Sequence, residues 1–279
     1  MFINLENYAG SMINYYQGDA SASYFDNNIS ILLKGGFQIT NNSDAIKRNG
    51  LLLFGNIEYR LNKFWTIKTS LYSGIEKTEY EDLITTNPYL STNTLLDHRY
   101  DIANIKGSIW YHPNESVMLS AGANWRYSDR NPNFITDTLA SFKLIYVDGI
   151  VFDIFGEVFW NITNNDRLIA NITLNMNDLK EDNHLTYTPL FRFSTTYNRN
   201  IIDNLKGFMT IELIGSRKLY IKENDILAPY VLMNIGLDYT IKPFNFYIKI
   251  NNLFNSNYAV WERYKEKSFY GAIGLIFMF

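Results

Sequence analysis

The chain has 279 residues, of which 47% are hydrophobic, 16% aromatic and 19% charged, and its formal net charge is -3. This much apolar sequence excludes an intrinsically disordered protein, and the absence of Lys/Arg runs argues against a nucleic-acid partner, because phosphate binding needs clustered cations. The chain has no cysteine, so disulfides, thiolate metal sites and cysteine nucleophiles are excluded. No stretch reaches the ~18 consecutive apolar residues of a transmembrane helix.

The beginning of the chain lacks the basic start and the apolar run of a signal peptide. We therefore expect the translated protein to begin upstream of Met1. From there on, most of the sequence alternates with a period of two, as in Ile31 and Leu33 against Leu32 and Lys34. Together with 21 Tyr, 19 Phe and 5 Trp, this alternation favours pleated strands. It predicts one strand within 8–25 and further strands near 29–39, 51–61, 64–74, 99–111, 116–127, 137–147, 150–160, 166–177, 188–197, 207–217, 231–241, 244–251 and 268–279.

These runs have the length of strands that cross a bilayer, which need ~9–11 residues, whereas strands in soluble proteins are mostly ~5–6. Their polar face carries charges of both signs in mid-strand, which indicates a wet lumen. Tyr and Trp near the strand ends, such as Tyr59 and Trp160, fit interfacial aromatic girdles. The candidate lumen-lining residues are Lys34, Glu58, Arg60, Lys106, Arg126, Arg192, Glu212, Asp238 and Lys249.

The connections between the strands fall into two kinds. Tight turns are predicted at 61–63, 112–115, 148–149 and 242–243. Longer loops are predicted at 75–98, 128–136, 178–187, 218–229 and 255–267. The alternation of short and long connections fails between 128 and 205, so at least one strand or turn there is misassigned. The sequence thus predicts an all-β, transmembrane, antiparallel up-and-down barrel of about 14 strands (12–16) with long external loops, as one domain over 1–279.

The last fifth of the chain carries a more specific pattern. The element Asn252-Leu253-Phe254-Asn255-Ser256-Asn257-Tyr258 follows a strand, and a final strand ends at Phe279. These segments resemble the carboxy-terminal end of TonB-dependent receptors. Upstream, residues 184–193 resemble a proline-containing strand start of that family, and 111–114 resemble one of its turns. The resemblance covers roughly 100–279 and is firmest from about 184.

The resemblance implies a bacterial outer-membrane protein surrounded by lipid. Its terminal aromatic strand, with Phe277 and Phe279, would be recognised by the barrel assembly machinery. Family members also have a barrel of about 22 strands and an amino-terminal plug that contacts TonB, and this chain has room for neither. The chain is therefore either the back part of a receptor or a small plugless relative. In either case, we expect the strand at 268–279 to pair with the first strand, because an open edge is costly in hydrocarbon.

Candidate ligand contacts lie in the last long loop, where aromatic rings could stack on a sugar, siderophore or cofactor. Anchoring of the same rings at the membrane interface is equally well supported. The lumen charges are likewise either a solute path or the lining of a barrel filled by a plug. The loop residues are Tyr258, Trp261, Arg263 and Tyr264.

The sequence predicts no enzyme, no cofactor and no metal site. The histidines His98, His112 and His184 lie in or beside turns and loops, and we expect all three at the surface. Carboxylates in the proposed loops lack the spacing of a calcium site, so we interpret them as solvated. These carboxylates are Glu76, Glu79, Glu81, Asp82, Glu181, Asp182, Glu223 and Asp225.

Three functions are compatible with the sequence. The leading hypothesis, which the resemblance implies, is receptor-type uptake of a scarce or bulky substrate of the siderophore, cofactor or glycan class, with loops that bind it and a plug that an energised partner remodels. The first alternative is a plugless, porin-like channel that passes small solutes along its charged lumen. The second alternative is a structural or adhesive barrel whose loops bind a surface partner.

Overall fold

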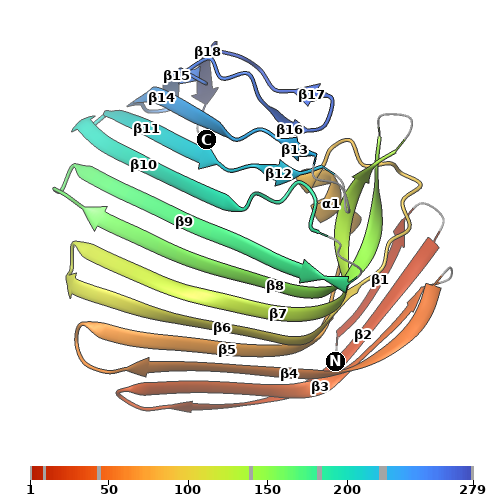
Figure 1. Ribbon diagram of the computed structural model, residues 1–279. Helices are drawn as coiled ribbons and strands as arrows, with labels where there is room; N and C mark the ends of the chain where they lie inside the picture. The colour runs from red at the N-terminus through yellow and green to blue at the C-terminus, as the bar shows by residue number, and fades with distance from the viewer. Residues whose placement is uncertain are drawn as a thin grey trace.

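The computed structural model describes residues 2–8, 11–42, 45–137, 141–180, 184–219 and 225–277. A single antiparallel sheet of 14 strands curves like part of a barrel wall (Figure 1). Neighbouring strands in the sheet follow one another along the chain, which confirms the predicted up-and-down connectivity. The helix α1 (Tyr80–Thr86) lies beside the loop ends of the strands. Within the described ranges, no helix has the length and apolarity to cross a membrane.

The strands differ in length, and the long ones form the middle of the sheet. In order, the sheet consists of β1 (Phe2–Tyr8), β2 (Ser11–Phe25), β3 (Ile29–Asn42), β4 (Ala45–Arg60), β5 (Trp65–Glu76), β6 (Arg99–Asn114), β7 (Val117–Thr136), β8 (Phe142–Asn161), β9 (Asp166–Leu179), β10 (Phe191–Ile202), β11 (Leu205–Ile214), β14 (Tyr230–Ile241), β15 (Phe244–Asn251) and β18 (Tyr270–Phe277). Two small hairpins lie in the loops: β12 (Arg217–Lys218) with β13 (Ile226–Leu227), and β16 (Ala259–Trp261) with β17 (Tyr264–Lys265).

Short turns join the strands at one end of the sheet, which we call the turn end. The other end, which we call the loop end, carries the long connections β5–β6, β9–β10, β11–β14 and β15–β18 (Figure 1). The predicted turn at 61–63 is confirmed. There, the Asn62 side-chain oxygen accepts hydrogen bonds from the backbone N–H groups of Phe64 (2.8 Å) and Trp65 (3.1 Å). An asparagine that bonds the backbone two residues on is a common way to close a tight turn.

Two predictions around residue 148 are wrong. The loop predicted at 128–136 is the far part of β7, and the turn predicted at 148–149 lies inside β8, so residues 142–147 and 150–160 belong to one strand. Both strands bend at this level: Ser128 pairs with Gly149, next to a bulge in β7. Gly149 has φ 149°, and a Cβ there would lie 2.5 Å from the Asp178 carbonyl oxygen. Gly149 therefore allows a bend within a strand and does not form a turn. Beyond it, β7 and β8 continue beside α1 (Figure 1).

The predicted strand count is confirmed, although through two errors that cancel. The split of β8 added one strand, whereas the single strand predicted within 8–25 is part of the pair β1 and β2. These two strands pair from Phe2 with Gln17 to Tyr8 with Ser11, and residues 9–10 between them lie outside the described ranges.

The two edges of the sheet are β1 and β18. In the described part of the chain, β18 pairs only with β15 and β1 only with β2. The expected pairing of the last strand with the first is therefore not observed. Because backbone groups at an edge have no partner in hydrocarbon, these two edges are the costliest feature of the sheet in a membrane.

Candidate functional site

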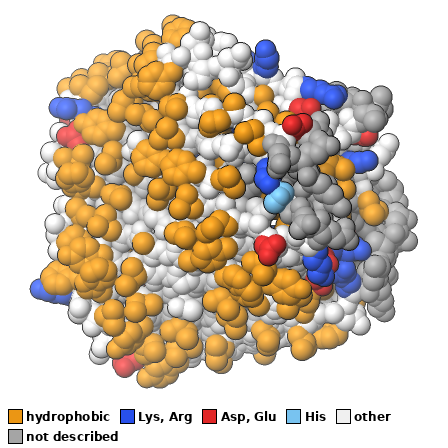
Figure 2. Space-filling model, viewed as in Figure 1, with side chains coloured by type: hydrophobic (Ala, Val, Ile, Leu, Met, Phe, Trp, Pro, Cys, Tyr) orange, Lys and Arg blue, Asp and Glu red, His pale blue; other side chains and the backbone are white. Residues whose placement is uncertain are grey.

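The two faces of the sheet differ in chemistry. One face, here called the outer face, carries exposed apolar side chains, among them Ile57, Ile105 and Ile248, which are 42%, 44% and 51% exposed. Figure 2 shows this apolar covering over the strands, with charged side chains mainly toward the two ends. The opposite, inner face carries most of the charged residues of the strands, whereas Arg199 and Asp166 lie on the outer face. Alternation along each strand fixes which residue reaches which face.

The strand register places all the candidate lumen-lining residues on the inner face. Glu58 pairs with Lys68, and Lys106 pairs with Ser70 and Asn124, so the polar positions of neighbouring strands stand side by side. The set is Lys34, Glu58, Arg60, Lys106, Arg126, Arg192, Glu212, Asp238 and Lys249. Whether these residues form a solute path or contact a plug stays a prediction.

The inner face has a depression of about 630 Å³ near the loop ends of β2 to β5, here called the rim pocket. Its wall is a chain of hydrogen bonds. The Gln38 side chain, 1% exposed, donates to the Tyr15 hydroxyl (2.7 Å) and accepts from the Ile75 N–H (2.7 Å). Tyr15 donates to Gln17 (2.5 Å), and Gln17 donates to Asp19 (2.6 Å). A fully bonded network of this kind holds its members in fixed positions.

The network ends in an ion pair. The Lys34 ammonium lies 3.2 Å from the Asp19 carboxylate at the pocket wall. The pocket therefore presents amide, hydroxyl and paired charged groups with no net charge from this pair. The sequence prediction found Lys34 but missed Gln38 and its partners. The signal that could have found Gln38 is its even-numbered position in a strand whose even positions face inward.

A second depression of about 460 Å³ lies at mid-height on the inner face. The Lys106 ammonium stands 4.8 Å from the centre of the Phe155 ring. Asp153 accepts a hydrogen bond from the Asn175 amide (2.5 Å), and Glu157 accepts one from the Ser120 hydroxyl (3.3 Å). Each charge on this stretch of wall thus has a partner, as expected for a hydrated lining that must remain ordered.

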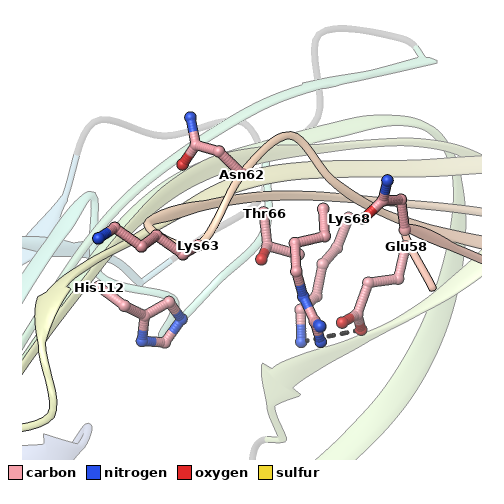
Figure 3. Close-up of a pocket in the computed structure, with 8 residues that line it drawn as sticks. Glu58, Asn62, Lys63, Thr66, Lys68 and His112 are labelled. Carbon is pink, nitrogen blue, oxygen red and sulfur yellow. Dashed lines mark ion pairs between the residues drawn. The ribbon is translucent and has the colours of Figure 1, made fainter.

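At the turn end, the inner face has a third depression of about 550 Å³, here called the turn-end pocket (Figure 3). Lys68 lies 3.2 Å from Glu58 and 4.7 Å from the centre of the Trp110 ring. Arg60 and Lys63 also line the pocket, so its three cations outnumber its single carboxylate. In a chain of net charge -3, this is a local excess of positive charge, which would attract an anionic group.

The loop end of the sheet contains a compact apolar core, here called the loop cluster. Its buried members come from three connections and from the start of β8: Leu83, Leu90, Leu96, Phe142, Leu144, Tyr187 and Trp261. Phe142 is fully buried and meets the rings of Trp261 and Tyr187 edge to face, with centroid distances of 5.2 and 5.4 Å. The cluster fixes the loops relative to one another.

The predicted ligand contacts in the last loop lie in different surroundings. Trp261 is 6% exposed inside the loop cluster, and Tyr264 stacks on Tyr89 at 3.4 Å. Tyr258 stacks on Tyr230 at 4.3 Å, and burial raises the pKa of its hydroxyl to about 12. Arg263 keeps a half-exposed side chain 3.8 Å from Glu262. A ligand that touched Trp261 would have to part the loops, whereas Arg263 is accessible.

A buried histidine and a buried arginine support this loop layer. His98 is 2% exposed, so the prediction that all three histidines lie at the surface is wrong for this one. Its Nδ1 accepts a hydrogen bond from the Thr78 N–H (3.1 Å), and burial, aided by the Lys77 charge, lowers its pKa to about 4. Arg217 donates to the carbonyl oxygens of Val260 (3.3 Å) and Ala228 (3.2 Å), which ties two loops together.

Of the predicted assembly signal, Phe277 lies on the edge strand β18. Phe277 is 49% exposed on the outer face and meets Phe244 of β15 edge to face at 5.5 Å. Phe279 lies outside the described residues, as do Glu181, Asp182 and Glu223. Among the described residues, no group of three or more His, Asp or Glu side chains could hold a metal ion.

Comparison with known proteins relates this fold to outer-membrane receptors. No family model and no curated protein sequence matches the chain. The siderophore receptor PirA from Acinetobacter baumannii matches with a TM-score of 0.68 and 12% identity, over 95% of this chain and 45% of that chain. The ferric yersiniabactin uptake receptor FyuA from Yersinia pestis gives 0.67 and 12%, over 95% and 44%. The copper transporter OprC gives 0.69 and 12%, over 89% and 42%.

These solved structures are TonB-dependent receptors, and their barrels share the fold of this chain. The predicted likeness is therefore confirmed at the level of the fold. The chain spans less than half the length of each of these three structures.

Proposed function

We propose that this chain forms the wall of an outer-membrane receptor that takes up a scarce or bulky substrate with the help of TonB. The main support for the proposal is that the sheet combines a continuous polar inner face with a packed loop cluster at one end. A passive pore needs the first feature alone, whereas a receptor needs ordered loops to hold a ligand above the lumen. The shared fold supports the same function.

The proposal implies a defined setting for the chain. The outer face would contact lipid, the barrel assembly machinery would insert the sheet, and the loop end would face outward, because long loops of such barrels are extracellular. The rim pocket, just below the loops, would receive the substrate first. The turn-end pocket would meet whatever fills or leaves the lumen on the periplasmic side.

We also propose that strands additional to these fourteen pair with β1 and β18 to close the wall. The unpaired edges support this, since each unsatisfied backbone group costs several kcal/mol in hydrocarbon. The test uses the cysteine-free chain with spin labels at Asn4→Cys in β1 and Leu275→Cys in β18. Direct pairing of these strands would bring their backbones within ~5 Å, and that result would overturn the proposal.

The function is tested by fractionation and conductance. Expressed in a Gram-negative host, the protein should be found in the outer membrane with heat-modifiable gel mobility. Reconstituted in planar bilayers, a receptor should show no steady conductance, because a filled or loop-covered lumen blocks ion flow. A steady open conductance would favour the porin-like channel instead. A closed wall whose isolated loops bind a cell-surface partner would favour the adhesive alternative.

A further inference from the structure

The outer face has a groove that the uptake function does not use. It lies between β10, β11, β14 and β15, close to the turn end, and has a volume of about 510 Å³. Its walls are almost entirely apolar and include Met209, Ile235, Leu237, Ile248 and Ile250. Strand parity places these side chains on the outer face, on the side opposite Asp238 and Lys249.

Gly207 occupies an outward-facing position near the start of β11 and lines the groove. A Cβ at this glycine would lie 3.3 Å from a Leu237 methyl and 3.5 Å from an Ile201 methyl. The side chains of Leu237 and Ile201 thus flank Gly207, which has no side chain of its own. Arg199 of β10 pairs directly across from Gly207.

The charge at the groove indicates what occupies it. Arg199 lines the groove and keeps its side chain 59% exposed, and its only ion pair in the described part of the chain is a long one, 3.7 Å from Nε to the Asp166 carboxylate. An arginine on a lipid-facing wall costs ~2–4 kcal/mol at the bilayer midplane but only ~0–1 near the interface. Arg199 stands beside Tyr197, a residue type that is frequent at that interface. The guanidinium terminus is thus available to a phosphate at the headgroup level.

We propose that this groove binds one anionic phospholipid, with an acyl chain over Gly207 and the phosphate on Arg199. The apolar groove matches the chain, and the exposed cation at its interfacial end matches the headgroup. Since the turn end of such a barrel faces the periplasm, the lipid belongs to the periplasmic leaflet. The inference rests on the proposed outer-membrane location.

The test is native mass spectrometry of the full chain, purified from outer membranes in mild detergent and titrated with phosphatidylglycerol. Wild-type protein should retain one lipid. Gly207→Leu, which fills the groove, and Arg199→Gln, which removes the charge, should each weaken retention by roughly tenfold. Gly35→Leu is the matched control, because Gly35 faces outward with nothing within 4 Å. Lys206→Gln is the control for charge on the inner face of the same strand.

Each outcome is decisive. Equal retention by Gly207→Leu and Gly35→Leu, or no retained lipid on a folded wild-type barrel, would overturn the lipid site while leaving the proposed function intact. Loss of the lipid only in Gly207→Leu would mean that a detergent-like apolar chain is bound without its headgroup, which also contradicts the proposal. Absence of the protein from the outer membrane would instead refute the proposed function.

Discussion

The loop cluster and the wall of the sheet both contain many aromatic and aliphatic side chains, but the cluster buries them and the wall exposes them on its outer face. In the loop cluster, aromatic and aliphatic side chains point inward, and Phe142 is fully buried. In the wall, apolar side chains cover the outer face, and Ile273 on the edge strand is 81% exposed. The loop cluster is built for water on its outside, and the wall is built for hydrocarbon on its outside and water on its inside.

The comparison teaches that the stability of the two regions has different sources. Hydrophobic burial and close packing hold the loop cluster together. The wall depends on backbone hydrogen bonds between strands and on an apolar exterior, since side-chain burial contributes little there. The same type of substitution should therefore have unequal effects in the two regions, and the following predictions test that difference.

The largest effect is expected for Phe142→Ala in the loop cluster. Removing this ring leaves a cavity among Trp261, Tyr187 and Leu90 and should destabilise the cluster by about 3–5 kcal/mol. Hydrogen exchange should then accelerate at the Ser91 N–H, which donates to the Phe142 carbonyl at 2.7 Å. Ile273→Ala on the wall is the control and should change neither loop exchange nor heat-modifiable mobility. Equal exchange in both variants would show that the loops do not depend on this core.

The next effect concerns the outer face. Ile248→Arg places a charge toward lipid and should cost ~2–4 kcal/mol, enough to reduce the amount of folded barrel in the membrane. Asn251→Arg, on the same strand but the inner face, should insert normally, because that side is wet. Heat-modifiable mobility of the two variants measures this directly. Similar loss from both substitutions would refute the assignment of the faces.

A smaller effect is expected where rings of the inner face cover glycines. A Cβ on Gly236 would overlap the Phe208 ring, so Gly236→Ala should cost ~1–3 kcal/mol through overpacking. Gly35→Ala, which meets nothing within 4 Å, should be neutral apart from lost backbone freedom. The melting temperature of the folded barrel reports both. If Phe208→Ala does not rescue Gly236→Ala, the ring is not the cause.

The wall could be predicted from the sequence because its rules are local. A period of two assigns each residue to a face without knowledge of its neighbours, and this is why Lys34 and Lys249 were placed on the wet side. The error at Gly149 is also local: Asp148-Gly149 has the composition of a hairpin turn, but its glycine is needed where β8 passes close to Asp178 and Leu179. Only the approach of another strand distinguishes the two cases.

The loop cluster could not be predicted, because its contacts join distant segments. Phe142 and Trp261 meet across more than a hundred residues, and no periodicity in either segment indicates the contact. The burial of His98 follows from the same cause, since the loops that cover it are placed by the cluster. For the same reason, the sequence could not decide whether Trp261 binds a ligand or anchors the protein at the membrane interface. In the structure, Trp261 packs inside the loop cluster.

The last effect, and the one that best separates the two regions, is a pH dependence confined to the loops. His98 lies outside the strands, and burial lowers its pKa from 6.5 to about 4. The folded loop favours the neutral ring, so its stability is complete above pH 6.5 and is lost progressively as the pH falls from 6.5 toward 4. Protonation of Nδ1 removes the acceptor of the Thr78 N–H and adds a charge near Lys77.

Hydrogen exchange at Thr78, corrected for intrinsic rates, should therefore rise between pH 6.5 and pH 4, while exchange of strand amides such as Ile248 stays constant. His98→Asn keeps a side-chain acceptor but has no proton to gain in this range, so it should flatten the dependence. His112→Asn, at the turn end, should leave it unchanged. A rise that persists in His98→Asn would assign the effect to the carboxylates of the loops, and a parallel rise in the strands would mean that the wall and the loops unfold together.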